Sequence, residues 1–78
     1  MSSTKLEKFA RMANQIGDFY ATQPTETAAK GVATHIRKFW TPKMIAQTLA
    51  ALEEKTISLN ETSARGFAVL KQETTNAG

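Results

Sequence analysis

The spacing of apolar residues near the start of the chain constrains its fold more than any other feature. Between residues 5 and 22, apolar side chains recur every three or four positions: Leu6, Phe9, Met12, Ala13, Ile16, Phe19 and Tyr20. A helix turns about 100° per residue, so these side chains form a single stripe. The opposite side carries polar residues: Glu7, Arg11, Asn14 and Asp18. This pattern predicts an amphipathic helix that packs through its apolar stripe.

Residues that start and stop helices divide the rest of the chain into three further segments. Pro24 suits the first turn of a second helix, which must end near Trp40 because Pro42 disfavours helical geometry in the residue before it. Thr41 can cap a third helix, and residues 58–61 have the spacing of a capping box before a short fourth helix. We therefore expect an all-α fold, a small helical domain of three to four helices built on an antiparallel helical hairpin.

The length of the chain, 78 residues, suits one domain. We expect residues 1–78 to form a single helical domain, ordered from about residue 4 to residue 72, with frayed termini. Small domains commonly gain stability from disulfides, metals or partners. With no cysteine and one histidine, the chain cannot ligate an iron–sulfur cluster or close a structural zinc site by itself. Good helix packing, a partner, or both must supply the stability.

Three properties of the sequence bear on its location. No stretch approaches the roughly 20 apolar residues that span a bilayer, and the N-terminal residues lack the apolar core of a signal peptide. The absence of cysteine also fits a reducing compartment. We therefore expect a cytoplasmic protein without membrane contact. Its net charge of +3 is enough for weak attraction to acidic surfaces but does not indicate nucleic-acid binding.

In an antiparallel hairpin of the first two helices, each step forward along the first helix meets a step backward along the second. Residues that lie opposite each other therefore have numbers with the same sum. Phe9 then faces Phe39, and Gly17 faces Gly31. A glycine inside a helix costs about 1 kcal/mol relative to alanine, so a close backbone approach at this level would account for both glycines. The alternative is that each glycine is a tolerated surface residue.

The sequence contains no convergent catalytic groups, such as a nucleophile with a base, a carboxylate pair or a set of metal ligands. We therefore expect a protein that is not an enzyme by itself and binds no cofactor alone. His35 is interpreted as a helix-boundary histidine bonded to the backbone or to a carboxylate. A basic cluster lies on and just after the second helix: Lys30, Arg37, Lys38 and Lys43. It indicates either a patch for an acidic partner, a cofactor phosphate or nucleic acid, or simply a solvated helix face.

Two positions are not explained by single helices. Asn14 is a poor helix former in an exposed helix interior, so either a partner that hydrogen-bonds its amide or a neutral surface role would account for it. Phe39 and Trp40 stand where the second helix stops. Phe39 is expected in the core. Trp40 either fills the corner between the second and third helices or, partly exposed, anchors a partner.

Several of these residues recur in a recognisable order. They are Arg11-Met12-Ala13-Asn14-Gln15-Ile16, then Phe19, Pro24, Gly31 and His35, and finally Phe39-Trp40-Thr41-Pro42-Lys43-Met44. Together they resemble the delta subunit of molybdenum-containing, NAD-dependent formate dehydrogenase, over about residues 6 to 52. The family pattern has an acidic residue where this chain has Thr41, and arginine where it has Lys43. Thr41 can still cap a helix, whereas Lys43 lacks the bidentate fork of arginine.

The resemblance implies a non-catalytic accessory subunit. In such enzymes the alpha subunit carries a molybdenum bis-pterin guanine dinucleotide and iron–sulfur clusters, and other subunits use FMN and NAD. The resemblance further implies binding to the catalytic alpha subunit, which would stabilise the complex or assist its cofactor maturation. The predicted contacts are family-like residues that the core does not require: Arg11, Asn14, Gln15, His35, Arg37, Trp40 and Lys43. The alternatives are a small basic nucleic-acid-binding module and a homo-oligomer in isolation.

Overall fold

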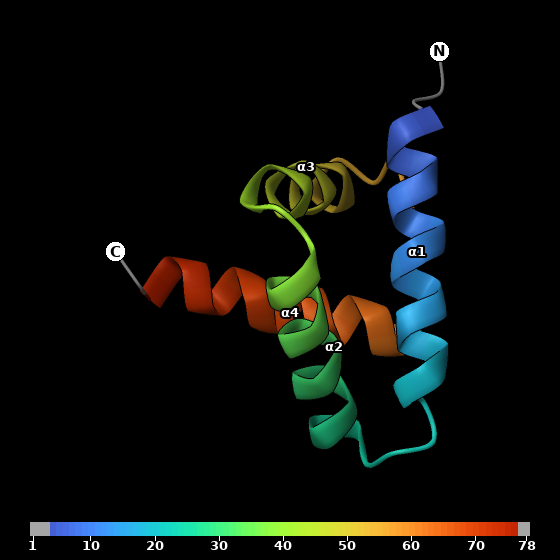
Figure 1. Cartoon of the computed structure of the whole chain (residues 1–78). Coiled ribbons are helices and arrows are strands. Elements are labelled where there is room, and N and C mark those ends of the chain that lie inside the picture. Colours follow the sequence, from blue (N-terminus) through green and yellow to red (C-terminus); the bar gives the residue numbers. More distant parts are fainter. Residues whose placement is uncertain (1–3, 77–78) are drawn as a thin grey trace.

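The computed structural model describes residues 4–76, which form four helices joined by short connections (Figure 1). These are α1 (Thr4–Tyr20), α2 (Thr25–Phe39), α3 (Pro42–Glu53) and α4 (Glu61–Asn76). No strand occurs within this range, which confirms the all-α prediction. The expected fraying of the termini concerns in part residues 1–3 and 77–78, which lie outside the described residues.

The boundary between α2 and α3 follows the prediction from the sequence. Thr41 has extended geometry, with φ −74° and ψ 155°, as expected for a residue before proline. Its Oγ1 accepts the backbone N–H of Met44 at 3.1 Å, and Pro42 occupies the first turn of α3. The proline lacks an N–H that would otherwise be left unpaired there. Local sequence therefore determines this corner of the fold.

The start of α4 differs from the prediction. Asn60, rather than Ser58, caps the helix, because its Oδ1 accepts the backbone N–H of Ser63 at 2.8 Å. The helix is also longer than its weak apolar pattern suggested, since it continues to Asn76. Contacts with α1 and α2, rather than an amphipathic pattern of its own, hold this helix in the fold.

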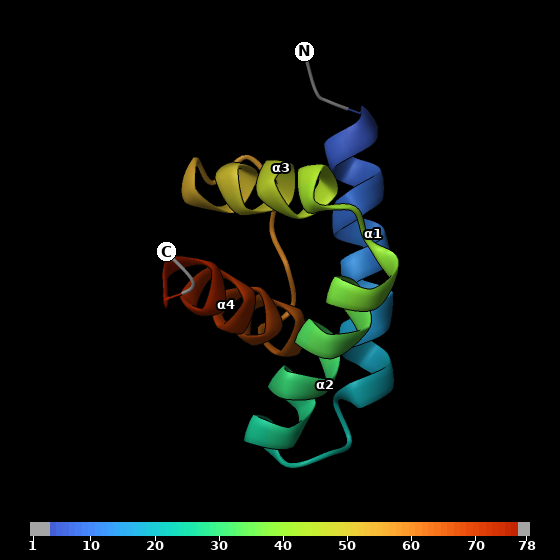
Figure 2. The same ribbon diagram turned by 60° about the vertical axis from the view of Figure 1, so that its left-hand side comes forward.

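Helix α4 packs against both α1 and α2. Helices α1 and α2 run antiparallel, and α4 crosses behind α2 with its N-terminal end against α1 (Figure 1). Helix α3 lies across the N-terminal part of α1 (Figure 2). The α2–α4 crossing is close because Gly66 has no side chain, and a Cβ there would overlap Val32. The main close helix approach is thus between α2 and α4.

The predicted close crossing of Gly17 and Gly31 is wrong. A Cβ at Gly17 would meet the side chains of Asn60 and Ser63, which belong to the start of α4. A Cβ at Gly31 would meet the ring of Tyr20 instead. Each glycine makes room for a different neighbour: the start of α4 lies against Gly17, whereas the Tyr20 ring of α1 lies against Gly31.

The core gathers side chains from α1, α2 and α4 around an aromatic centre. Its buried members are Phe9, Ala13, Val32, Ala33, Ile36, Trp40, Phe67 and Leu70. The Trp40 ring lies 5.6 Å from that of Phe9 and 5.7 Å from that of Phe67, measured between centroids. Such spacings are typical of favourable aromatic pairs. Phe9 therefore packs against Trp40, and the predicted pairing of Phe9 with Phe39 is wrong.

Candidate functional site

Two phenylalanines lie on the surface, although they belong to helices with buried apolar faces. Phe19 is 74% exposed and Phe39 is 70% exposed. Full burial of such a side chain is worth roughly 1.5–3 kcal/mol, so the exposure of both gives up stabilisation that the fold would otherwise gain. Exposed apolar patches on small proteins typically mark interaction sites.

A hollow lies between the two helices that carry these phenylalanines. Its volume is about 260 Å³, and it is lined by Gln15, Ile16, Phe19, Tyr20 and His35. The rings of Phe19 and Tyr20 meet edge to face with centroids 5.1 Å apart. The His35 ring lies 4.8 Å from that of Phe39, which extends the surface along α2. We call the five lining residues together with Phe39 the aromatic groove.

The glycine at position 31 makes this groove possible. A Cβ on residue 31 would lie 2.6 Å from Cε1 of Tyr20, which is closer than a side chain tolerates. Without one, the Tyr20 ring lies directly against the backbone of α2. His35 and Phe39 follow Gly31 at intervals of four residues, so all three share one face of the helix. The groove is therefore built from one face of α2 and the C-terminal half of α1.

The structure brings two of the predicted contact residues together in the groove. Gln15 and His35 line it from different helices. Arg11 precedes Gln15 by four residues, so it lies on the same side of α1, and it is exposed. Lys43 is exposed in the first turn of α3. These four residues stay predictions for partner contact, and their accessibility is compatible with that role.

Two other predicted contact residues form bonds within the chain. The Arg37 guanidinium pairs with the Glu73 carboxylate on α4. Oδ1 of Asn14 accepts the backbone N–H of Asn60 at 2.8 Å, and the Asn14 carbonyl oxygen accepts the Asn60 side-chain amide at 3.1 Å. The asparagine at position 14 is therefore explained without a partner protein.

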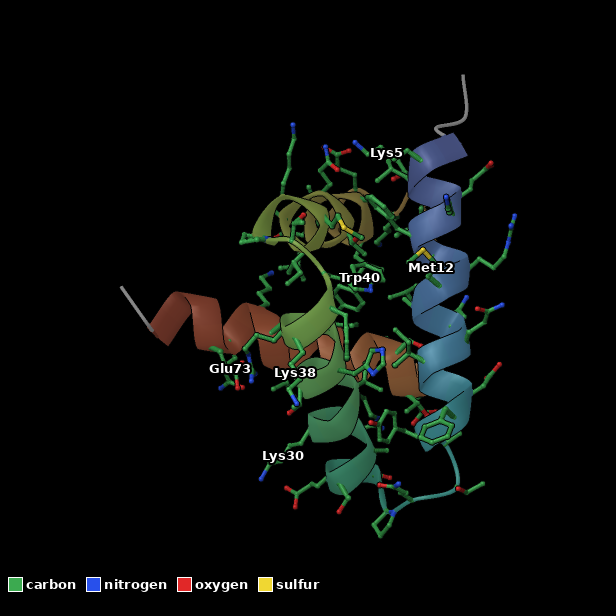
Figure 3. All side chains as sticks on the ribbon, in the orientation of Figure 1. Lys5, Met12, Lys30, Lys38, Trp40 and Glu73 are labelled. Atoms are coloured by element: carbon green, nitrogen blue, oxygen red, sulfur yellow. The ribbon has the colours of Figure 1, made fainter. Side chains whose placement is uncertain are left out.

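Phe39 lies on the surface, and Trp40, for which two alternatives were open, lies in the core. Trp40 is only 6% exposed, so the core alternative holds for it and the exposed-anchor alternative is wrong. Figure 3 shows Trp40 directed inward, between α1 and the end of α2. The expectation that Phe39 is in the core is wrong. Trp40 follows Ile36 by four residues and so continues the face of α2 that packs on α4, a spacing from which its burial was predictable.

The chemistry of the groove is that of a binding surface. Its lining combines aromatic and aliphatic side chains with one amide and one imidazole, and no carboxylate of the described residues is part of it. Within residues 4–76, no group of three or more His, Asp or Glu side chains is placed to hold a metal ion. None of the helices described combines the length and the apolar character needed to cross a membrane. The groove suits an apolar side chain from another molecule.

Comparison with known proteins identifies a family for the chain. The family model described as NADH-dependent formate dehydrogenase delta subunit FdsD matches residues 8–66, which is more than half of the chain. The matched range includes all of α2 and α3, most of α1 and the start of α4. No curated protein and no solved structure matches the chain.

Proposed function

The chain belongs to the NADH-dependent formate dehydrogenase delta subunit family, and on this premise we propose that it binds the catalytic alpha subunit through the aromatic groove. The observation that carries the proposal is the exposure of Phe19 and Phe39 on one accessible surface. Aromatic side chains are enriched at the centres of protein interfaces, where a few of them supply most of the binding energy. In this account the two rings are anchors, and the fold presents them on two rigid helices.

The proposed contact set differs in part from the one predicted from the sequence. Phe39 takes the place of Trp40, which is buried in the core. Gln15 and His35 supply polar groups beside the two rings, and Arg11 lies along the same side of α1. Polar groups at the edge of an apolar centre set the orientation of a partner. We therefore expect orientation to depend on Gln15 and His35, and affinity to depend on the phenylalanines.

Co-purification tests this function directly. A tagged copy of the chain, expressed in the cells of origin, is expected to capture the alpha subunit of formate dehydrogenase, as identified by mass spectrometry. Deletion of the chain is expected to lower formate oxidation. If the tagged chain captures no alpha subunit and its deletion leaves formate oxidation intact, the proposal is wrong.

The benefit of binding takes one of two forms, stabilisation of the complex or maturation of its cofactors. They differ in the composition of enzyme made without this chain. A low content of molybdenum and pterin indicates maturation. A normal content, combined with faster loss of activity on heating, indicates stabilisation, because a bound partner stabilises the folded complex by mass action.

The nucleic-acid alternative gains no support from the structure. Nucleic-acid-binding domains usually present a dense basic face. Here Arg37 is paired with Glu73, and Lys30 extends outward from α2 on the side that also carries Arg37 (Figure 3). The basic cluster seen in the sequence is therefore partly neutralised by an ion pair and is divided between α2 and α3, where Lys43 lies.

A further inference from the structure

The ion pairs of the described side chains are concentrated on one part of the molecule. All three involve α4: Arg37–Glu73, Arg65–Glu61 and Lys71–Glu53. A fourth carboxylate, that of Asp18, accepts the side-chain amide of Asn60 at the start of α4 at 3.1 Å. Four of the seven carboxylates thus form ion pairs or hydrogen bonds that involve α4 or the residue before it.

The cations on the groove side of the molecule have no such partners. Lys8 precedes Gln15 by seven residues, so it shares the side of α1 that carries Gln15. Arg11 is four residues from both Glu7 and Gln15, so it lies between the side of the carboxylates and the groove side. Lys38 follows His35 by three residues on α2. Lys8 and Lys38 are both exposed, and neither has an ion pair or hydrogen bond to another described side chain. They form a basic rim along both sides of the aromatic groove, and we call them the groove cations.

The carboxylates of these two helices lie farther around each helix from the groove than Lys8 and Lys38 do. Glu7 and Asp18 are seven residues before and four residues after Asn14, so they share the side of α1 that is bonded to α4. Glu26 precedes Arg37 by eleven residues, three turns of helix, and therefore lies on the face of α2 that turns away from the groove. The groove thus combines an apolar centre with a rim of one charge sign.

We infer that the occupant of the groove is an acidic segment of the partner, with an apolar side chain that enters between Phe19 and His35 and carboxylates that meet the groove cations. The inference rests on the proposed function, because the segment is assigned to the alpha subunit. Charge complementarity is its basis: an unpaired cationic rim around an apolar centre favours a partner of the opposite charge. Exposed ion pairs add little affinity, but they accelerate association and make it sensitive to salt.

Association kinetics provide the test. The full chain is immobilised, and binding of enzyme prepared from cells that lack this chain is followed at low and high ionic strength. The groove variant carries Lys8→Glu and Lys38→Glu. Its matched control carries Lys30→Glu and Lys55→Glu, two exposed lysines away from the groove, and so has the same net charge. Circular dichroism melts are used to check that both variants fold.

We expect the association rate of the native chain to fall at least tenfold between low and high salt. The groove variant should associate at least tenfold more slowly than the control at low salt, with a weaker dependence on salt. Equal rates for the groove variant and the control would overturn the inference. So would association that is insensitive to salt.

The outcomes separate this inference from the function on which it rests. If Phe19→Ala with Phe39→Ala abolishes binding while the charge variants bind normally, the groove is the docking site but its occupant is not acidic. If the native chain does not bind the enzyme at all, both proposals fail. If the groove cations instead hold duplex DNA at physiological salt and the enzyme does not compete, the occupant is a nucleic acid and the inference is wrong.

Discussion

Asn14 and Gln15 are neighbours in α1, yet they belong to surfaces with opposite properties. On the Asn14 side, polar groups are bonded within the chain. Asn60 donates its side-chain amide to the Asn14 carbonyl and to the Asp18 carboxylate, and the buried Ser63 hydroxyl donates to the Ala13 carbonyl at 2.7 Å. We call these five residues the α1–α4 clasp.

The Gln15 side has none of this internal pairing. It presents two exposed phenylalanines and a rim of unpaired cations around a hollow. Hydrogen bonds between buried groups stabilise a fold, because a buried polar group without a partner is costly. Exposed rings and free cations contribute little to folding. The difference shows which side of α1 maintains the structure and which side is available to a partner.

The sharpest contrast in stability lies between adjacent aromatic residues. Trp40→Ala should lower the free energy of unfolding by about 3–5 kcal/mol, because Trp40 is central to the core. Phe39→Ala should change it by less than about 0.5 kcal/mol, because the ring is exposed. Urea unfolding followed by circular dichroism measures both. Similar losses for the two variants would contradict the assignment of Phe39 to the partner surface.

The clasp should be the next most sensitive region. Asn60→Ala removes the cap of α4 and the side-chain amide that bonds the Asn14 carbonyl and the Asp18 carboxylate, so we expect a loss of about 2 kcal/mol. The backbone N–H of residue 60 keeps its bond to Oδ1 of Asn14. Gln15→Ala, on the groove side, should change stability by no more than about 0.5 kcal/mol. The same urea experiment applies. A neutral Asn60→Ala would show that the clasp contributes nothing to the stability of the fold.

The glycines at positions 17 and 31 offer the finest comparison. In Gly17→Ala the new methyl group would lie 2.6 Å from Oδ1 of Asn60 and 3.0 Å from the backbone nitrogen of Ser63, both held by the cap of α4. We expect a net loss of about 1 kcal/mol, because strain exceeds the gain in helix propensity. In Gly31→Ala the half-buried Tyr20 ring can move, so the change should be close to zero. Thermal melts of the two variants, measured in parallel, test this order.

The sequence predicts the local features of this fold well. The end of α2, the Thr41 cap and the start of α3 at Pro42 were all predictable, because each depends on residues next to one another. The class of the fold was predictable for the same reason. Apolar spacing within a helix reports which face is buried, whatever covers that face.

The packing of α4 was not predictable from local pattern. The Asn14 amide finds its partner 46 positions along the chain, and nothing near Asn14 indicates this. Helices α1 and α2 still contact each other, but not through the residue pairs that the simple hairpin assigned, and Phe39 lies outside the core. Phe19 was expected in the stripe of α1, but α4 meets that helix at Ala13 and Gly17 and leaves Phe19 uncovered.

Part of the candidate site was nevertheless accessible from the sequence. Gln15 and His35 were predicted contacts and do line the groove. The aromatic rings that define it were assigned to the core, because an apolar residue at helical spacing is ordinarily buried. The cause of the error is therefore physical. Whether such a ring is covered depends on tertiary neighbours, which a single sequence does not specify.

The central claim, that the two exposed phenylalanines anchor a partner, is tested most directly by one affinity measurement. Titration calorimetry would compare the native chain, Phe19→Ala with Phe39→Ala, and the exposed α4 control Gln72→Ala, each with formate dehydrogenase prepared without this chain. We predict a Kd at least tenfold weaker for the aromatic variant, a loss of about 1.4 kcal/mol or more, with native affinity for the control and similar melting temperatures for all three. A Kd for the aromatic variant within twofold of the native value would contradict the account.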